Sequence, residues 1–272
     1  MADPRMLAAY GRWMCSKMIC RTTPRLTLPG GSKVGEWLSF SEYWSFKNII
    51  PVAERLFIER HLSAESGGLT AFDIGANLGA FTCLMASQGH SLHSFEPIPE
   101  TFCRFKKNVK FNGLLNRAHL NCLAVGKEQG LVTFHIQEDS PATNRMAPPG
   151  DALNKPGTST QIVAAVTLDQ YCSTQGIEHI DFVKIDVEGM EPYVLQGAKR
   201  LLEERRIAAI LIEICPTNLY SVGLSPAVLY REFEIARYSP FVIMPDGTPG
   251  EKLTLKEVEA MSLDNIALLP DV

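Results

Sequence analysis

Residues 72–82 read Phe-Asp-Ile-Gly-Ala-Asn-Leu-Gly-Ala-Phe-Thr. A short apolar run ends in an acid, Asp73, and a small-residue loop with Gly75 and Gly79 leads into a helix-like segment. This pattern is typical of a parallel strand that passes into a helix at a nucleotide-type pocket, where glycines let the backbone approach a ligand and the first helical turn presents free N–H groups. The spacing G-x-x-x-G differs from the G-x-G-x-x-G of dinucleotide-binding loops.

The position of Asp73 indicates the kind of ligand that the loop would hold. A carboxylate at the end of a strand suits a cationic or hydroxyl-bearing ligand better than a pyrophosphate, and S-adenosylmethionine carries an ammonium group, a sulfonium and a ribose. Asn77 is predicted to cap the helix or to donate to the ligand. An ordinary strand-to-helix turn would explain the same loop, so a second observation is needed.

Glu96 supplies that observation, because it ends the next predicted strand, residues 91–96. A carboxylate at this place can accept two hydrogen bonds from a ribose diol. An exposed loop acid is the simpler alternative for Glu96 alone, but its spacing from Asp73 makes the pair a stronger signal than either residue.

Strand and helix signals alternate from residue 69 onward and predict an α/β fold, a mostly parallel sheet with helices on both faces. We therefore divide the chain into residues 1–68, an N-terminal helical and hairpin extension that serves as a lid or a dimer element, and residues 69–272, the α/β domain. The extension contains a Gly-rich hairpin or lid segment at 26–40 and a helix at 46–63. Residues 138–160 are rich in Pro, Gly and Ser and predict a long functional loop.

A second dense cluster, residues 181–191, surrounds the end of a strongly predicted strand and contains Lys184, Asp186 and Glu188. Alternation places Lys184 and Asp186 on the same side of the strand. A lysine beside carboxylates can hold a base ionised or position a substrate oxygen, whereas a structural ion-pair network is the alternative. Glu213 ends the following strand, and since ligands bind at the carboxyl ends of parallel strands, these acids and those at 73 and 96 should face one cleft.

The bulk composition limits partners and compartment. The net charge of −4 and the pI near 5.9 argue against a general nucleic-acid-binding surface. The seven scattered cysteines contain no C-x-x-C pair, which favours a reducing compartment and a cytoplasmic protein. No apolar run reaches the ~20 residues of a transmembrane helix. The six histidines have no convincing metal-ligand spacing, and only His135, before the long loop, is kept as a weak base candidate.

Residues 1–25 carry five basic side chains against one acid and show apolar residues at helical spacing. This pattern fits a membrane-surface or targeting helix, but we favour a helix that packs on the domain or on a second copy in a homodimer, because amphipathic helices are far more often packing elements.

Four ordered motifs resemble the FkbM-type methyltransferases. They are Asp-Ile-Gly-Ala-Asn-x-Gly-x-x-Thr at 73–82, Phe-Glu-Pro at 95–97, Thr-Leu-Asp at 167–169 and Val-Lys-Ile-Asp-Val-Glu-Gly-x-Glu at 183–191. The resemblance spans about residues 70–215 and covers neither 1–45 nor the segment after about 240. It implies a class I Rossmann-like fold, whose mostly parallel sheet we expect to have seven strands. It also implies methyl transfer from S-adenosylmethionine to a hydroxyl of a small molecule, typically a sugar or secondary metabolite.

Roles carried over by position divide the site residues into groups. The resemblance implies that Asp73, Gly75, Asn77 and Gly79 hold the methionine part, Glu96 holds the ribose, Ala124 lies near the adenine, and Lys184, Asp186, Glu188 and Glu213 line the methyl-transfer side. A hydroxyl is a weak nucleophile and needs a base, for which we favour Asp186 first and Glu213 second. The loop 138–160 and residues 26–45 are expected to form the acceptor pocket.

Three alternatives stay open at this point. A divalent metal could activate the hydroxyl, with Asp169, Asp186 and Glu213 as oxygen ligands. The chain could be a catalytically inactive, cofactor-binding scaffold that works through its N-terminal helix. It could also be a dinucleotide-dependent oxidoreductase, although the G-x-x-x-G spacing and the lack of a catalytic Tyr/Lys pattern argue against that class.

Overall fold

The computed structural model describes residues 6, 9–10, 13–14, 25–37, 39, 42–43, 46, 49–63, 68–137, 145–146 and 158–271. Most of the predicted helix within residues 1–25 and most of the predicted loop 138–160 therefore lie outside the described residues. None of the helices in the described ranges combines the length and apolar character needed to cross a membrane.

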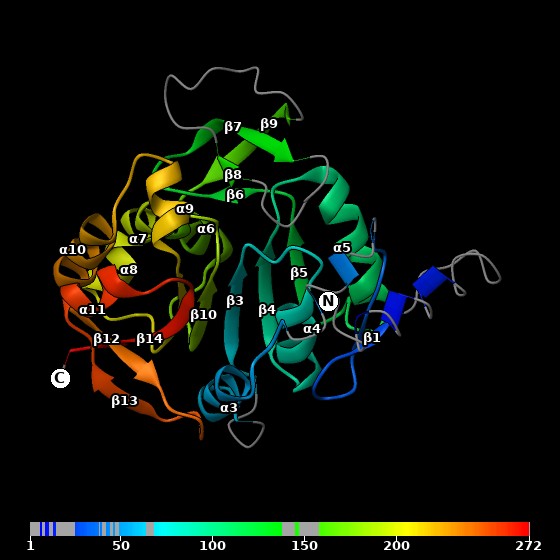
Figure 1. Ribbon diagram of the computed structural model, residues 1–272, viewed down its shortest axis with the longest axis horizontal. Helices are drawn as coiled ribbons and strands as arrows, with labels where there is room; N and C mark the ends of the chain where they lie inside the picture. Colours follow the sequence, from blue (N-terminus) through cyan, green and yellow to red (C-terminus); the bar gives the residue numbers. More distant parts are fainter. Residues whose placement is uncertain are drawn as a thin grey trace.

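The described elements are shown in Figure 1. The strands are β1 (Leu26–Thr27), β2 (Lys33–Val34), β3 (Thr70–Ile74), β4 (Ser91–Phe95), β5 (Ala118–Asn121), β6 (Ala124–Val125), β7 (Gly130–Gln137), β8 (Arg145–Met146), β9 (Thr158–Val166), β10 (Phe182–Ile185), β11 (Ile210–Ile214), β12 (Tyr238–Ile243), β13 (Pro249–Lys252) and β14 (Asp264–Pro270). The helices are α3 (Val52–His61), α4 (Ala80–Ser87), α5 (Pro99–Phe111), α6 (Leu168–Gln175), α7 (Glu191–Gly197), α8 (Lys199–Glu203), α9 (Pro216–Ser221), α10 (Pro226–Ala236) and α11 (Leu255–Ala260).

The main sheet confirms the predicted α/β architecture. Within the described ranges it has eight strands in the order β13-β12-β14-β11-β10-β3-β4-β5, and all neighbours from β11 to β5 are parallel. The strands β14, β12 and β13 add to it in antiparallel pairings. The prediction of seven strands is wrong, because the described sheet has one strand more, the edge strand β13. Its sequence Pro-Gly-Glu-Lys lacks the β-branched and aromatic residues that mark a strand, and it forms only through its hairpin with β12.

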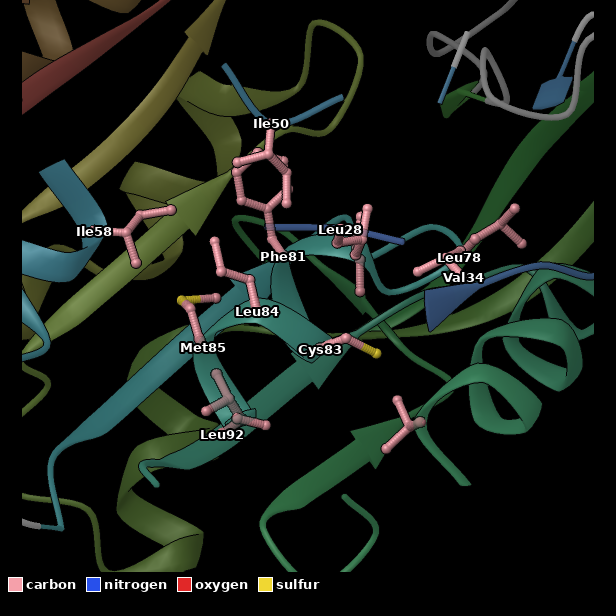
Figure 2. Close-up of a cluster of buried hydrophobic side chains, with 14 of the residues drawn as sticks. Leu28, Val34, Ile50, Ile58, Leu78, Phe81, Cys83, Leu84, Met85 and Leu92 are labelled. Carbon is pink, nitrogen blue, oxygen red and sulfur yellow. The ribbon is translucent and has the colours of Figure 1, made fainter. Parts of the chain in front are cut away.

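Two hydrophobic cores cover the two faces of this sheet. Successive side chains of a strand point to opposite faces, so Ala71 and Phe182 pack in the core that holds α3, α4 and α5, while Phe72 and Val183 pack with α6, α7, α8 and α10. Figure 2 shows part of the first core, including Phe81, Leu84 and Met85 from α4. The same alternation places Asp73 and Lys184, which are direct register partners, on the α3 and α4 face.

A second, smaller sheet lies over the carboxyl ends of β3, β4 and β5, at the top of Figure 1. It has the order β6-β9-β7-β8. Residues 118–125 do not form one strand, because β5 pairs with β4 whereas β6 pairs with β9. The chain leaves the main sheet at Cys122, so that Ala124 and Phe134 close over the strand ends together with Ile98.

The N-terminal hairpin is confirmed as the antiparallel pair β1 and β2. Two asparagines one turn apart hold it, Asn108 on α5 and Asn112 at the C-cap of α5. The Asn108 side chain accepts from the Gly35 N–H at 2.9 Å and donates to the Gly35 carbonyl at 3.2 Å, and Asn112 does the same with Lys33 at 2.8 Å in both directions. Further along, the buried Arg104 guanidinium donates to Glu42 at 2.8 Å. The described part of residues 25–43, which we call the strap, is thus fixed to α5.

The predicted helix 46–63 begins only at Val52. Pro51 precedes it with φ −60° and ψ 155°, an extended conformation at the N-cap. Proline suits a helix entrance but not a helix interior, since it lacks an N–H donor, and Phe46, Ile49 and Ile50 consequently lie outside α3. Phe46 and Ile49 from this segment reach the carboxyl edge of the sheet, where the candidate site lies.

Candidate functional site

The glycine loop after β3 is held between the ends of β4 and β10. The N–H groups of Gly75 and Ala76 both donate to the Phe95 carbonyl, at 3.0 and 2.9 Å. Gly75 has a φ of 87°, and a Cβ on it would lie 1.7 Å from the carbonyl oxygen of Asp186. Only glycine allows both the left-handed backbone and this close approach. The loop therefore brings the cofactor motif and the Asp186 motif into direct contact.

Asn77 does not cap the helix, so that part of the prediction is wrong. The N-cap of α4 is Gly79, with a φ of 83°, and no side chain makes the cap hydrogen bond. The Asn77 backbone N–H instead donates to Glu96 Oε2 at 3.1 Å, and its own side-chain Oδ1 is buried with no donor among the described residues. Asn77 therefore presents an unused acceptor at the loop, which leaves contact with a ligand as the remaining prediction for it.

A cavity of about 200 Å³ opens beside the loop at the carboxyl ends of β3, β4, β10 and β11. Most of the predicted site residues line it: Gly75, Asn77, Glu96, Ala124, Lys184, Asp186, Glu188 and Glu213. The polar members come from four different strand ends, as the topology requires. Apolar side chains complete the wall, among them Phe46, Phe81, Ile98, Phe134 and Met190. The cavity thus has a charged side and an apolar side.

Asp73 and Gly79 are not among the residues that line the cavity. Asp73 is 1% exposed and accepts a 2.6 Å hydrogen bond from the Thr82 hydroxyl. Burial raises the pKa of Asp73, and the nearby ammonium of Lys184 opposes that rise. A Cβ on Gly79 would lie 2.4 Å from the Phe105 ring, so this glycine lets α4 pack on α5. Both residues lie beneath the loop, away from the cavity. Their predicted contacts with the cofactor have no support in this geometry.

Lys184 and Asp186 form the expected pair, since Lys184 Nζ donates to Asp186 Oδ2 at 2.7 Å. The ammonium also lies 4.4 Å from the centroid of the Phe81 ring. Burial by itself lowers the pKa of Lys184, but the carboxylates of Asp186 and Asp73 outweigh it and raise this pKa above its ordinary value. Lys184 is therefore a fixed positive charge that is hydrogen-bonded to the Asp186 side chain.

Glu213 has a pKa well above the ordinary value of a glutamate. Burial and the neighbouring Asp186 carboxylate raise the pKa of Glu213 to about 9, with Lys184 acting in the opposite direction. At neutral pH the Glu213 side chain therefore carries its proton and can donate a hydrogen bond, which does not suit a general base. The raised pKa of Glu213 counts against it as the base, and Asp186 stays the first candidate.

The turn after β10 is fixed by acids on both sides. Glu188 has a φ of 56°, and its Oε2 accepts from the Asn218 side chain of α9 at 2.7 Å. The Glu191 carboxylate accepts from the backbone N–H groups of Val187 and Gly189, both at 3.1 Å, and burial raises the pKa of Glu191 to about 7. These hydrogen bonds hold the turn in place. Glu188 therefore lines the cavity while its carboxylate is hydrogen-bonded to Asn218 of α9.

Two other candidates lie away from the cavity. His135 is buried in β7 and is not among the lining residues, so its assignment as a base has no support. Asp169 accepts from the N–H groups of Arg200 and Leu201, at 2.8 and 3.0 Å, at the start of α8. The metal alternative therefore lacks its third ligand, and no group of three or more His, Cys, Asp or Glu in the described ranges could hold a metal ion.

Several residues of the cavity wall were not predicted from the sequence, because they are apolar. Phe46, Ile98, Leu123 and Phe134 carry no chemical signature in the sequence, where a wall residue looks the same as a core residue. Only their positions just after predicted strand ends offered a signal, and for Phe46 even that signal is absent.

Glu54 is a buried acid of α3, 6% exposed, that sits close to the same charges. Its Oε1 accepts from the Asn265 side chain at 3.0 Å, and among the described residues neither Glu54 Oε2 nor Asn265 Oδ1 has a partner. Burial raises the pKa of Glu54 to about 7, with Lys184 opposing the rise. Because the folded state binds its proton more tightly than the unfolded state, the contribution of Glu54 to stability falls as pH rises from about 4.5 to 7.

The substitution Glu54→Gln should remove this loss. We expect the variant to gain about 2 kcal/mol in the free energy of unfolding near pH 8, and little near pH 5, when measured by urea unfolding at both pH values. Glu59→Gln, on a less buried part of the same helix, is the matched control and should show no pH-selective gain. An equal effect of Glu54→Gln at both pH values would contradict the assignment of the buried proton.

Comparison with known proteins decides the family. The family described as the methyltransferase FkbM domain matches residues 73–240, more than half of the chain. The chain belongs to the FkbM methyltransferase family. The match confirms the resemblance read from the four motifs and the choice of S-adenosylmethionine as cofactor, and it counts against the oxidoreductase alternative.

Curated relatives of this FkbM-family chain are similar at low identity. The 2-O-methyltransferase NoeI of Sinorhizobium fredii is 28% identical over 160 residues, which cover 54% of this chain and 64%, less than two thirds, of NoeI. The 31-O-demethyl-FK506 methyltransferase FkbM of Streptomyces tacrolimicus is 24% identical over 200 residues, covering 64% of this chain and 75% of the relative.

A solved structure supports the fold. The crystal structure of a SAM-dependent methyltransferase from Agrobacterium tumefaciens aligns with a TM-score of 0.53 at 11% identity, covering 92% of this FkbM-family chain and 71% of that protein. At this identity the likeness speaks for the fold alone, and it confirms the Rossmann-like methyltransferase architecture.

The residues of the FkbM-family cavity fit S-adenosylmethionine. The Asn77 Oδ1 acceptor matches an ammonium group, and Gly75 leaves room for a ligand against the backbone. Glu96 accepts one N–H on each oxygen, from Asn77 and from Ile98 at 2.9 Å, and each oxygen keeps further acceptor capacity for a hydroxyl. The apolar side chains of Ile98, Leu123 and Val125 offer faces for a purine.

Proposed function

We propose that this FkbM-family chain transfers a methyl group from S-adenosylmethionine to a hydroxyl of a sugar or a secondary metabolite. The observation that carries the proposal is the Lys184–Asp186 pair, 2.7 Å apart, in the same cavity as Asn77 and Glu96. A cofactor-binding module would not need an ion pair with a buried ammonium beside its ligand. The names of the relatives NoeI, a 2-O-methyltransferase, and FkbM, a 31-O-demethyl-FK506 methyltransferase, also favour an oxygen acceptor.

The cofactor would be held by residues at its two ends. Asn77 and Gly75 would contact the methionine part, Glu96 the ribose hydroxyls, and Ala124 with its apolar neighbours the adenine. When bound, S-adenosylmethionine supplies an electrophilic methyl group. The protein has to align the acceptor oxygen with that group and to exclude water, which provides much of the rate enhancement in such displacements.

The acceptor side would be served by three residues. Asp186 takes the proton of the acceptor hydroxyl, which makes the oxygen a better nucleophile. Lys184 holds the Asp186 side chain in place through their hydrogen bond. Glu213, protonated at neutral pH, donates a hydrogen bond to the acceptor oxygen and orients it. Glu188, tied to Asn218, would shape the same side of the cavity.

Calorimetric titration tests the cofactor assignment directly. We expect S-adenosylmethionine and S-adenosylhomocysteine to bind and NAD to give no heat. Turnover is then followed as S-adenosylhomocysteine release with a panel of methyl and alkyl glycosides and simple alcohols. Absence of S-adenosylmethionine binding would sink the proposal, and tight binding without turnover on any acceptor would favour the inactive scaffold.

Replacing Glu96 by Gln should weaken S-adenosylmethionine binding by about tenfold to a hundredfold, because hydrogen bonds to a charged group are lost. Burial raises the pKa of Glu96 to about 7, so its carboxylate is protonated below that pH and can accept fewer hydrogen bonds. In the unaltered protein, cofactor affinity should therefore increase as pH rises through 7, whereas the Glu96→Gln protein should lose this dependence. Titrations at several pH values measure both, and Glu100→Gln, at the exposed start of α5, is the control.

A further inference from the structure

A second groove, about 400 Å³ in volume, lies next to the cofactor cavity. It is formed by residues 26–29, which are β1 and the turn after it, by Phe46, and by residues 49–52 at the entrance of α3. Among its described lining residues none is charged, and Thr27 contributes the polar side chain. Val52 at its rim is 62% exposed, so the groove opens to solvent. We call it the strap groove.

The strap groove adjoins the methyl-transfer side of the cavity. Phe46 and Ile49 line both spaces and form the partition between them. Ile50 of the groove belongs to the same buried cluster as Phe81, and Figure 2 shows these two side chains together with Leu28. The Phe81 ring in turn lies against the Lys184 ammonium. The groove is thus placed at the end of the cavity that holds the reactive ion pair.

We propose that the strap groove receives an apolar part of the methyl acceptor, which makes the preferred acceptor a hydroxylated molecule that carries an alkyl or ring body. The inference rests on the proposed function, since it needs an acceptor hydroxyl at Asp186. The charged side of the cavity, which would recognise a hydroxyl, lies beside the apolar strap groove, which is about 400 Å³ in volume. A highly charged acceptor, such as an oligonucleotide or a phosphorylated sugar, would find no partner in the described lining of the groove.

The same arrangement explains why the partition is aromatic and aliphatic. A ligand that spans both spaces passes Phe46 and Ile49, and burying its apolar surface there is favourable in proportion to the area removed from water. A polar ligand would instead lose hydrogen bonds to water on entry without gaining any from these side chains. The groove therefore selects for the body of the acceptor while the cavity selects for its hydroxyl.

Alkyl glucosides of increasing chain length test the inference, because each carries sugar hydroxyls on one end. The full chain is saturated with S-adenosylhomocysteine and titrated with hexyl, octyl and decyl glucoside below their micelle-forming concentrations. Affinity should rise by about fourfold per added methylene, or roughly 15-fold for each step of the series. The same affinity for all three glucosides would overturn the proposal.

A pair of variants locates the binding. Val52→Asp places a charge at the rim of the groove, at a helix start where an acid is tolerated, and should weaken octyl glucoside binding at least tenfold with S-adenosylmethionine affinity unchanged. Leu263→Asp, a replacement of another exposed apolar residue (60%) outside the groove, is the matched control and should change neither affinity.

The outcomes separate this inference from the proposed function. Loss of the chain-length response in Val52→Asp alone supports it. The same dependence of affinity on chain length in both variants overturns the inference, even when S-adenosylmethionine still binds. A homodimer that is detected by sedimentation and that Val52→Asp dissociates also overturns it, because a second copy would then occupy the groove. Failure of S-adenosylmethionine to bind the unaltered chain overturns the proposed function instead.

Discussion

Replacing Asp186 by Asn is expected to lower kcat for methyl transfer by about 10²- to 10⁴-fold, the usual range for loss of a general base. The Asn side chain has the same shape but cannot take a proton from the acceptor hydroxyl. The backbone of Asp186, whose carbonyl packs on Gly75 and whose N–H donates to the Ile74 carbonyl, is unaffected by the change. Cofactor affinity, measured by calorimetry, should therefore stay within about threefold of the unaltered protein.

The comparison with Glu213→Gln makes this prediction specific. Glu213 is protonated at neutral pH, and a glutamine amide keeps a hydrogen-bond donor at the same place, so we expect kcat to fall by less than about tenfold. Asp246→Asn, in an exposed loop, serves as the control for the chemical change alone. Initial rates of S-adenosylhomocysteine release decide between the two acids, and a larger loss in Glu213→Gln than in Asp186→Asn would transfer the role of base to Glu213.

Replacing Gly75 by Ala is expected to destabilise the protein by more than about 3 kcal/mol and to abolish cofactor binding. The new methyl group would lie 1.7 Å from the Asp186 carbonyl oxygen, so either the glycine loop or the end of β10 must move. The left-handed backbone at this position, with φ at 87°, adds strain for any residue with a Cβ. Both the loop and the base would then be displaced together.

Gly176→Ala is the matched control, because Gly176 at the end of α6 also has a left-handed backbone, with φ at 68°, but nothing lies within 4 Å of its missing Cβ. Backbone strain alone should cost it about 1 kcal/mol. Thermal unfolding and calorimetric titration of both variants separate the two effects. Similar losses in both would mean that the close approach of Gly75 to Asp186 is unimportant.

The strand ends could be predicted from sequence because they combine two signals, an apolar run and a polar residue after it. Glu96, Asp186 and Glu213 line one cavity, as this signal predicts, and Lys184 lines it as well, as its alternation with Asp186 predicts. Asp73 carries the same signal, but whether a strand-end acid points into the cavity or into the layer beneath depends on the face it occupies. The Thr82 hydroxyl and the Lys184 ammonium interact with Asp73 in the buried layer, and these contacts can be seen only in the folded structure.

Features that depend on distant contacts could not be predicted. The sequence of β13 has no intrinsic strand preference and forms by pairing with β12, which in turn lies against β14. The split of residues 118–125 into β5 and β6 likewise depends on the partner β9, some forty positions later in the chain. Phe46 reaches the cavity because the strap is bound to α5, a contact between segments that share no sequence pattern.

The attachment of the strap by Asn108 and Asn112 has a consequence for how such a protein can change over evolutionary time. Both amides recognise the backbone of Gly35 and Lys33, not their side chains. These four hydrogen bonds therefore do not depend on the side chains of the strap, in contrast to the ion pair between Arg104 and Glu42. Under the proposed role of the strap groove, substitutions in its wall would change the acceptor while the Lys184–Asp186 pair stays the same.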